Sequence, residues 1–225
     1  MMHCSMPFGD VVRQRRSIRS FTDVPVPDDV LLDALAEAQL TPSNSNTQPW
    51  IPHVVGGAAL RRLSEALLRA EERGLHTLDF PYDGALYEGE YGVRRSRQGR
   101  HLLDTFGVQR DDQEGRQEIV RHNLRFFGAP NAVFLFMPSF GNLRTAVDVG
   151  MYAQSLLLSL SARGVGSIAQ TTLGFYADTV RETLGIGTGL KLIFGMSIGY
   201  ADSDWVRRTP RIGRAPVEEV AVLHR

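Results

Sequence analysis

The stretch Arg13-Gln14-Arg15-Arg16-Ser17-Ile18-Arg19-Ser20-Phe21 places four arginines and two serines before the first obvious structural element. Guanidinium groups form bidentate, charge-assisted hydrogen bonds to phosphate oxygens, and small hydroxyls can satisfy the remaining oxygens. On its own, a cluster of this kind is more often a solvated basic segment. A binding role therefore depends on what the rest of the chain offers.

A second polar stretch lies at residues 42–50, with the sequence Pro-Ser-Asn-Ser-Asn-Thr-Gln-Pro-Trp. Asn44, Asn46 and Gln48 supply amide donors and acceptors of the kind that bind the edge of a polar heterocycle. Trp50 is expected in the core or in the wall of a pocket. The two stretches together point to a flavin, which carries both a phosphate and a heterocycle.

A further arginine cluster occupies residues 207–214, near the other end of the chain. If this tail packs beside the N-terminal stretch, five arginines could converge on one anion: Arg15, Arg16, Arg19, Arg211 and Arg214. The alternative is two independent solvated faces.

The composition limits the classes of partner. The 225 residues carry 25 Lys+Arg against 25 Asp+Glu, which does not indicate wholesale binding to nucleic acid or to a membrane surface. No apolar run approaches the ~18 residues that span a bilayer. Residues 1–8 lack the cationic start and apolar stretch of a signal peptide. The single cysteine, Cys4, cannot form an internal disulfide, which fits a reducing compartment, so we expect a cytoplasmic protein.

Hydrophobic periodicity and turn residues predict an alternation of helices and strands. Asp28 is expected to cap the first long helix, and the apolar run 132–137 is expected to be a central strand. We predict helices at 28–40, 60–73, 117–127, 145–163 and 176–184, and strands at 51–55, 132–137, 190–200 and 217–223.

Residues 75–115 mix aromatic, arginine and glycine residues with weak periodicity. Excursions of this length are usually functional lids or disordered linkers, and the aromatic content argues against disorder. We predict a partly helical lid within a single domain, residues 1–225.

Three motif classes give no site. Gly164-Val165-Gly166-Ser167-Ile168-Ala169 spells a dinucleotide fingerprint, but a helix precedes it, so it is interpreted as a helix C-cap and turn. The six histidines are scattered without metal-ligand spacing. No Gly-x-Ser-x-Gly elbow is present, and nothing singles out Cys4 as a nucleophile. We expect no metal and no catalytic nucleophile.

Residues 15–21 resemble the Arg-Arg-Ser-x-Arg-x-Phe signature of the FMN-dependent nitroreductase superfamily. Residues 42–50 look like its Pro-Ser-x-x-Asn-x-Gln-Pro-Trp loop, and residues 214–219 resemble its Arg-x-Pro-Leu-Glu-Glu ending. The branch similar to nitrobenzoate reductase is matched at residues 91–95, 123–130 and 148–151. The resemblance covers nearly the whole chain, in order.

The resemblance implies an α+β, three-layer α/β/α fold, with a mostly antiparallel sheet flanked by helices and a C-terminal arm exchanged across a homodimer. It implies that the phosphate, ribityl chain and pyrimidine edge of FMN are held by Arg15, Arg16, Ser17 and Arg19, and that Arg214, with Arg211, completes the phosphate site. The partner subunit would contribute Pro42, Ser43, Asn44 and Asn46. The isoalloxazine ring near N5 would lie along Gln170, Thr171, Thr172, Leu173 and Gly174.

The resemblance also implies a ping-pong transfer of electrons from NAD(P)H to a nitroaromatic or quinone, in which the flavin does the chemistry. Arg19 is the candidate cation near N1 and O2 of the flavin, with a second phosphate ligand as the alternative role. A small aromatic substrate would be lined by Tyr91, Arg94, Arg95, Phe126 and Phe127, with Arg94 or Arg95 pairing with an acidic substituent.

One position departs from the better-known members. Thr171-Thr172 stands where some carry Pro and Glu, and is similar to the Thr-Thr of flavin-dependent iodotyrosine deiodinases. A hydroxyl near N5 could favour one-electron chemistry and tune the flavin. Reductive dehalogenation and a non-catalytic flavin-binding module therefore stay open as alternatives, and no ribose-reading motif chooses between NADH and NADPH.

Overall fold

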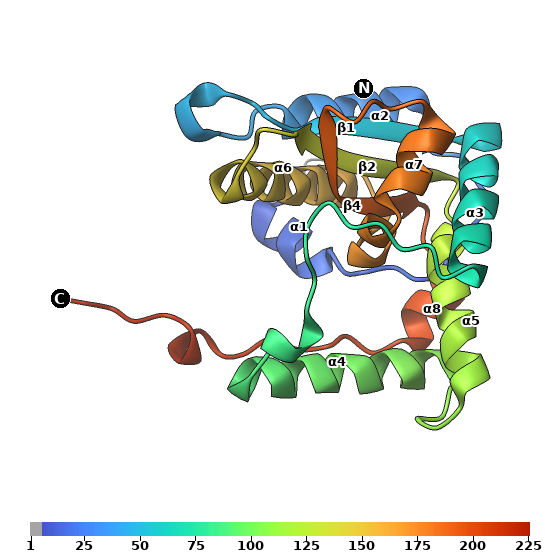
Figure 1. The fold of residues 1–225 in the computed structure, drawn as a ribbon. Coiled ribbons are helices and arrows are strands. Elements are labelled where there is room, and N and C mark those ends of the chain that lie inside the picture. Colours follow the sequence, from blue (N-terminus) through green and yellow to red (C-terminus); the bar gives the residue numbers. More distant parts are fainter. Residues whose placement is uncertain (1–5) are drawn as a thin grey trace.

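A computed structural model describes residues 6–225, so the expectations about Cys4 lie outside the described residues. Its centre is a four-stranded sheet with the order β1-β2-β4-β3 (Figure 1). The strands are β1 (Ile51–Gly56), β2 (Asn131–Pro138), β3 (Gly166–Gln170) and β4 (Leu190–Gly199). Every neighbouring pair is antiparallel, and β2 and β4 occupy the middle. The prediction of a central strand at 132–137 is confirmed.

The side chains of β2 alternate between two apolar cores, as the period of a strand requires. Phe134 and Phe136 belong to one core cluster, and Val133 and Leu135 belong to the other. All four are at most 1% exposed, so the sheet is buried on both faces. An antiparallel sheet without a solvated face must have helices on both sides.

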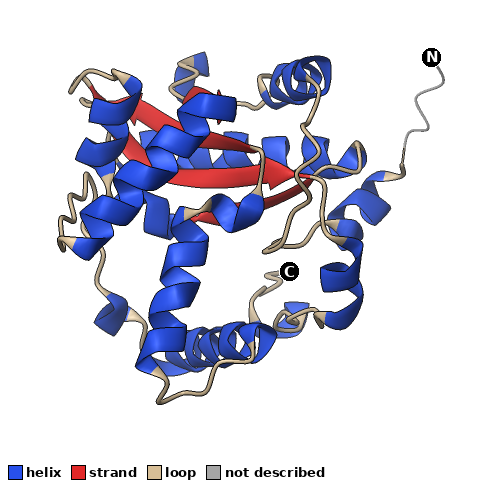
Figure 2. Ribbon diagram, turned by 90° about the vertical axis from the view of Figure 1, so that its right-hand side faces the viewer, coloured by secondary structure: helices blue, strands red, loops and turns tan. Residues whose placement is uncertain are grey.

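Helices cover both faces of the sheet, as Figure 2 shows. One face packs against α3 (Gly57–Glu72), α5 (Gln113–Leu124) and α7 (Ala177–Leu184). The other packs against α2 (Asp28–Ala38) and α6 (Leu143–Ala162). The prediction of an α+β, three-layer fold is confirmed, whereas the exchange of an arm across a homodimer stays a prediction.

Local sequence explains where the main helices begin. Asn142 starts α6 with a capping box, because its side chain accepts from the backbone of Thr145 while the Thr145 hydroxyl accepts from the backbone N–H of Asn142. Asp112 caps α5 by accepting from Gly115 N at 2.8 Å, which starts that helix four residues before the predicted 117.

Three local predictions were wrong in part. Asp28 is the first residue of α2 rather than its N-cap, since Pro27 takes that position. Gly164 adopts a left-handed turn after α6 as expected, but Gly166 begins β3 instead of continuing the turn. Residues 217–223 contain a 3₁₀ turn at Val217–Glu219 and no strand, because in the described chain they have no neighbouring strand to pair with.

The excursion at 75–115 is partly helical, as predicted, and is built around α4 (Gly89–Phe106). This helix has no buried residue and lies away from the sheet, with the C-terminal tail running beside it (Figure 1). The tail follows α8 (Ser203–Arg208) and ends beyond the body of the molecule.

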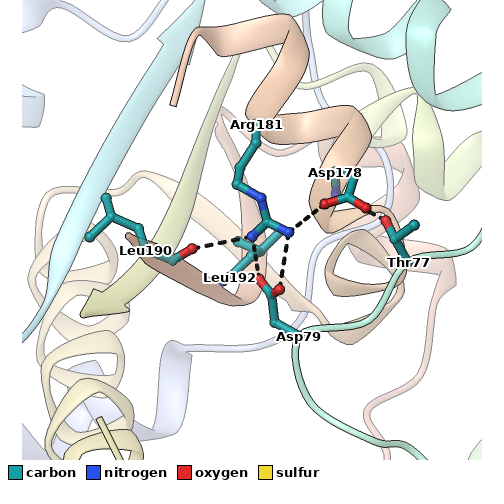
Figure 3. A network of polar contacts seen from close by, with 6 residues as sticks. All are labelled: Thr77, Asp79, Asp178, Arg181, Leu190 and Leu192. Carbon is teal, nitrogen blue, oxygen red and sulfur yellow. Dashed lines mark hydrogen bonds and ion pairs between the residues drawn. The ribbon is translucent and has the colours of Figure 1, made fainter. Parts of the chain in front are cut away.

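A polar network fixes the start of the excursion to the body (Figure 3). Asp79 forms a bidentate pair with Arg181 of α7, at 2.5 and 3.0 Å, and also accepts from Leu192 N of β4 at 2.7 Å. Arg181 further contacts Asp178 at 2.6 Å. The Asp79 and Arg181 side chains are only 14% and 11% exposed. The segment that leads from Asp79 to α4 is therefore anchored to the body by a nearly buried ion pair.

Residues 6–225 offer no helical membrane span and no cluster of metal ligands. No helix in that range is both long and apolar enough to span a bilayer. In the same range, no three His, Cys, Asp or Glu side chains are grouped so as to hold a metal ion.

Candidate functional site

Backbone hydrogen bonds hold the N-terminal arginine stretch along the edge of the sheet. After α1 (Phe8–Gln14), Ile18 N donates to Ser167 O of β3 at 3.1 Å. Phe21 N then donates to Phe127 O at 3.3 Å, and Thr22 N donates to Tyr200 O at 2.9 Å. Ile18 and Phe21 are buried, whereas the arginines between α1 and Phe21 stay partly exposed. Ile18 and Phe21 thus anchor the stretch in the core, while its arginine side chains remain accessible to a ligand.

The two ends of the chain are joined by a reciprocal set of contacts. Arg16 donates to the carbonyls of Thr209 at 2.7 Å and Val206 at 3.3 Å. Arg211 donates to the carbonyls of Arg13 and Gln14, the latter at 2.8 Å. The Arg16 guanidinium also lies 5.2 Å from the ring centroid of Trp205, a cation–π distance. The C-terminal tail is therefore docked on the N-terminal stretch.

This docking creates a cleft of about 1180 Å³ between the N-terminal stretch, the tail, α4 and Gln154 of α6. No Asp or Glu side chain of the described chain lines it. Its lining includes Ser17 and His101 together with eight arginines: Arg13, Arg15, Arg16, Arg19, Arg94, Arg97, Arg211 and Arg214. The five arginines that were expected to converge therefore do line one cavity.

The arginines of the cleft repel one another. Burial, followed by the charges of Arg214 and Arg211, lowers the pKa of Arg15. Burial and Arg211 lower the pKa of Arg16, and burial and Arg16 lower the pKa of Arg19. Within residues 6–225, no carboxylate lies at ion-pair distance from Arg15, Arg19 or Arg214. Because arginine does not deprotonate in proteins, these charges call for an anion.

A phosphate fits this set of donors better than a carboxylate side chain or a metal would. Guanidinium groups from two directions can each contact two phosphate oxygens, and the Ser17 hydroxyl lies among them. Arg16 and Arg211 already bind backbone carbonyls of the opposite segment, and Arg214 donates to the neighbouring carbonyls of Ile212 and Gly213 at 3.3 and 3.1 Å. Arg15 and Arg19 are thus the cations most available to a ligand, and Arg214 has only local carbonyl contacts and no carboxylate partner within residues 6–225.

The polar loop 42–50 lies outside the cleft of its own chain. Its conformation is fixed locally: Asn44 N donates to the buried carboxylate of Asp148 on α6 at 3.2 Å, and Gln48 N donates to Ser43 Oγ at 2.9 Å. Ser45, Asn46 and Gln48 all have positive φ angles of 48–55°. Non-glycine residues held in this conformation often mark binding sites. Pro42, Asn44 and Asn46 are exposed and available to another molecule.

Trp50 closes the loop from inside the fold. Its ring is buried, stacks on Tyr152 with centroids 4.9 Å apart, and donates from Nε1 to Gln39 Oε1 at 2.9 Å. Of the two interpretations given above, Trp50 takes the core position.

The strip 170–174 begins at Gln170, the last residue of β3, and continues into a 3₁₀ turn. Gln170 is 3% exposed, and its side chain is used internally, accepting from Ser197 Oγ and donating to Asn123 O at 3.0 Å. Leu173 and Gly174 are also buried, and only 2.8 Å separates a Cβ built on Gly174 from Ile193 O. Thr171 is exposed and Thr172 is half-buried. A ligand over this strip would meet the threonines and backbone, not the side chains of Gln170 or Leu173.

The five residues expected around a substrate separate into two groups. Tyr91, Arg94 and Arg95 lie on α4, and Arg94 lines the cleft while its guanidinium lies 5.8 Å from the Tyr91 ring centroid. Phe126 and Phe127 are 1% and 5% exposed and pack in the core, although both have positive φ angles. In a single chain these two rings do not face the cleft, so their contact with a substrate stays a prediction.

Sequence reasoning missed Arg97 and His101, which line the cleft from α4. The signal was present in their spacing: Arg94, Arg97 and His101 stand at i, i+3 and i+7, which places them on one helical face. The weak apolar periodicity of the excursion concealed it, since the face carries charge instead of apolar side chains.

Comparison with known proteins decides the family. The model of the nitroreductase family matches residues 12–200. The chain belongs to this family. Nitroreductase NfnB of Mycolicibacterium smegmatis is 41% identical over 215 residues, which cover 96% of this chain and 92% of that protein. A 4-nitrobenzoate reductase of Nocardioides sp. is 35% identical over 217 residues, which cover 94% of this chain and 87% of that protein.

A solved member of the nitroreductase family has almost the same fold. It is the FMN-dependent nitroreductase NfnB from Mycobacterium smegmatis, in complex with NADPH. The TM-score is 0.94 at 40% identity, and the match covers 96% of this chain and 97% of that chain. The nitroreductase resemblance of the sequence, including its nitrobenzoate-reductase branch, is confirmed.

Proposed function

We propose that this protein is an FMN-dependent oxidoreductase that passes reducing equivalents from NAD(P)H to nitroaromatic or quinone-like acceptors by a ping-pong mechanism. The observation that carries the proposal is the convergence of Arg15, Arg19 and Arg214, from both ends of the chain, on one cleft without a carboxylate. A phosphate-bearing cofactor matches that charge. The solved relative described as FMN-dependent and bound to NADPH supports the same cofactor and donor.

Bound FMN would supply the electron-accepting and electron-donating ring, so no side chain of this protein needs to act as a nucleophile. Arg15, Ser17 and Arg214 would hold the phosphate, and Arg211 would hold the N-terminal stretch in place. Arg19 would lie toward the pyrimidine ring, where a fixed cation stabilises the negative charge that reduction adds. Arg16 mainly secures the tail through the carbonyls of Val206 and Thr209.

The site would be completed by a second copy of the chain. Pro42, Ser43, Asn44 and Asn46 lie outside their own cleft, and a homodimer would bring them to the flavin of the partner. The exposed face of α6 supports this arrangement, because Leu143, Val147 and Met151 stand at four-residue spacing and are 80%, 55% and 38% exposed. An apolar stripe of this kind is typical of an interface.

The strip Gln170–Gly174 would contact the flavin with its backbone groups and with the two threonine hydroxyls. Tyr91, Arg94 and Arg95 would contribute to the substrate side. The exposed Thr171 hydroxyl is the observation that favours the alternative reaction, reductive dehalogenation, because a hydroxyl donor near N5 would favour one-electron steps.

Purification in the presence of FMN tests the proposal directly. We expect a yellow protein whose flavin absorbance bleaches when NADPH or NADH is added without oxygen, and returns when nitrobenzoate is added. Return of colour with a halophenol, accompanied by halide release, would favour the dehalogenase instead. A protein that binds FMN but is not reduced by either donor would be a flavin-binding module, and one that never binds FMN would contradict the whole proposal.

The dimer is tested separately by Val147→Asp, which places a charge in the middle of the apolar stripe. We expect the variant to elute as a monomer and to lose FMN, since residues 42–46 of a second copy would no longer reach the flavin. The matched control is Arg62→Asp on the exposed surface of α3. A monomeric wild-type protein that retains FMN would refute the shared site.

The proposal also includes two expectations from the sequence, a single domain and a cytoplasmic location. The chain is treated as a single domain, supported by the two core clusters that share one sheet. A cytoplasmic location is supported by a sequence with a single cysteine, and cell fractionation tests it.

A further inference from the structure

The arginine cleft has two walls with different origins. One wall is formed by the N-terminal stretch and the tail, which the proposed function assigns to FMN. The opposite wall is α4, from which Arg94, Arg97 and His101 line the same cavity. Their spacing of three and four residues places them on one face of the helix. The cleft therefore has cationic groups on α4 that are distant in sequence from the arginines assigned to the FMN phosphate.

The number of cations exceeds what FMN requires. FMN carries a single phosphate, whereas eight arginines line the cleft and no Asp or Glu of the described chain does. The chain as a whole has equal numbers of acidic and basic residues, so this excess is local. Asp10 pairs with Arg13 and Glu219 pairs with Arg94, whereas the other six arginines of the cleft have no carboxylate at ion-pair distance within residues 6–225. A surface that concentrates six such charges can take a second anion beside FMN.

The three α4 side chains suit a terminal phosphate rather than a pyrophosphate. Pyrophosphates are usually held by free backbone N–H groups at the first turn of a helix. Arg94, Arg97 and His101 lie in the middle of α4, which spans Gly89–Phe106, where the backbone N–H groups are used within the helix. Such a site can offer only side chains, and guanidinium groups bind a phosphate monoester through two oxygens each.

The two arginines of this wall differ in their present contacts. Arg94 lies 3.5 Å from the carboxylate of Glu219, which the C-terminal tail brings to the helix. Arg97 is exposed and has no carboxylate at ion-pair distance within residues 6–225. Glu219 thus neutralises one cation of the pair and leaves the other available.

We propose that Arg94, Arg97 and His101 form a subsite for the ribose 2′-phosphate of NADPH, and that this subsite makes the enzyme prefer NADPH to NADH. The inference rests on the proposed function, because it assigns the donor of that same reaction. Only the 2′-phosphate distinguishes the two donors, so a cation that binds it raises affinity for NADPH alone. Glu219 competes for Arg94 and limits that preference.

The test uses the FMN-loaded enzyme and the variants Arg97→Ala, Arg94→Ala and their combination. We expect Arg97→Ala to raise the KM for NADPH about tenfold, as loss of a charge-assisted hydrogen bond implies, and to leave the KM for NADH within a factor of about two. Arg94→Ala should raise the KM for NADPH by a smaller factor, because Glu219 competes for Arg94. A readout without turnover is the dissociation constant of NADP⁺ and of NAD⁺ for the oxidised enzyme, measured by calorimetry. We expect only the constant for NADP⁺ to rise.

Two further variants sharpen the test. Arg100→Ala removes an exposed arginine of the same helix that does not line the cleft, and it should change neither donor's KM. Glu219→Gln removes the competing carboxylate, and it should lower the KM for NADPH without affecting that for NADH.

Other outcomes would overturn the inference. Equal losses for NADH and NADPH would place the shared pyrophosphate, not the 2′-phosphate, against α4. If Arg100→Ala raised the KM for NADPH as much as Arg97→Ala does, general attraction of anions to α4 would explain both effects. A wild-type enzyme that uses both donors equally well would leave the proposed reductase intact and remove the subsite. A wild-type protein that binds no FMN would instead contradict the proposed function itself.

Discussion

Arg16 donates to backbone carbonyls of the C-terminal tail, and Arg211 of that tail donates to backbone carbonyls of the N-terminal stretch. Each arginine therefore anchors the segment that carries the other. Both use carbonyl oxygens as acceptors, so neither charge is neutralised by a carboxylate. The joint holds the two ends of the chain together and leaves the positive charge of the cleft intact.

Arg211→Ala should release the tail and open the cleft. We expect the dissociation constant for FMN to rise at least about tenfold, because the variant loses the two hydrogen bonds that position Arg214 beside Arg15. Fluorescence titration with FMN measures the change. Arg207→Ala is the control, since that exposed arginine pairs with Asp204 on the surface. Unchanged FMN affinity together with a protected tail in limited proteolysis would contradict the role of the joint.

Arg19 and Arg214 should affect the flavin differently. Arg19→Ala is expected to lower the reduction potential of bound FMN more than it weakens retention, because it would remove the cation that we propose lies nearest the charge added by reduction. Arg214→Ala is expected to weaken retention more than it changes the potential. Dye-coupled potentiometry and FMN titration separate the two effects. If both variants simply lose FMN, Arg19 is a further phosphate ligand.

Arg181→Met should destabilise the fold by ~3–5 kcal/mol, because it leaves the nearly buried carboxylate of Asp79 without its partner. Urea unfolding measures the loss. The double variant Asp79→Leu with Arg181→Met should recover part of it, since no charge then remains buried. Arg69→Ala is the control, because its exposed pair with Glu65 at 3.9 Å should contribute at most ~1 kcal/mol. Equal losses for the single and double variants would argue against an uncompensated charge as the cause.

Glu71 should give the protein an acid-sensitive component of stability. The pKa of Glu71 lies below its ordinary value, because Tyr176 Oη donates to the carboxylate at 2.6 Å and His76 Nε2 lies 2.8 Å away, while burial acts in the opposite direction. A lowered folded-state pKa contributes stability above the unfolded-state pKa of ~4.3, and that stability is lost as the pH falls through the folded-state pKa.

The variant Glu71→Gln should therefore unfold at lower urea concentration than the wild type at pH 7, and the two midpoints should approach each other below pH ~4. Tyr176→Phe should move the same way, since it removes the first of the two donors. Wild-type and Glu71→Gln midpoints that stay parallel from pH 7 to ~3 would exclude the linkage.

Much of the fold was predictable because burial on both faces leaves a clear pattern. The apolar run at 132–137 could only be a central strand, and the broad apolar face of 145–163 could only be a core helix. The apolar tail at 217–223 has the sequence pattern of a strand but no partner strand in the described chain, so the pattern alone predicted a strand that does not form. Gly166 was misassigned because small residues carry little preference, and its pairing with Gly199 of β4 decides its conformation.

The candidate site was predictable in its charges and not in its geometry. Arginine clusters at the two ends of the chain are visible in the sequence, but the carbonyl contacts that join them have no side-chain signature, because any residue can supply a backbone acceptor. The same limit applies to Gln170, whose residue type suits a flavin edge but whose amide is used by Ser197 and Asn123.

The joint between Arg16 and Arg211 also sets an order of events during synthesis. Arg15 to Arg19 leave the ribosome before any strand of the sheet, and Arg211 and Arg214 leave it after the last strand. The middle strand β4 is the last of the four strands to emerge, so the sheet is completed only after residue 199 and the cleft only after residue 214. The nascent protein must therefore fold its core before it can acquire a cofactor, and a chain interrupted before residue 211 would contain every strand of the sheet and still lack the means to hold one.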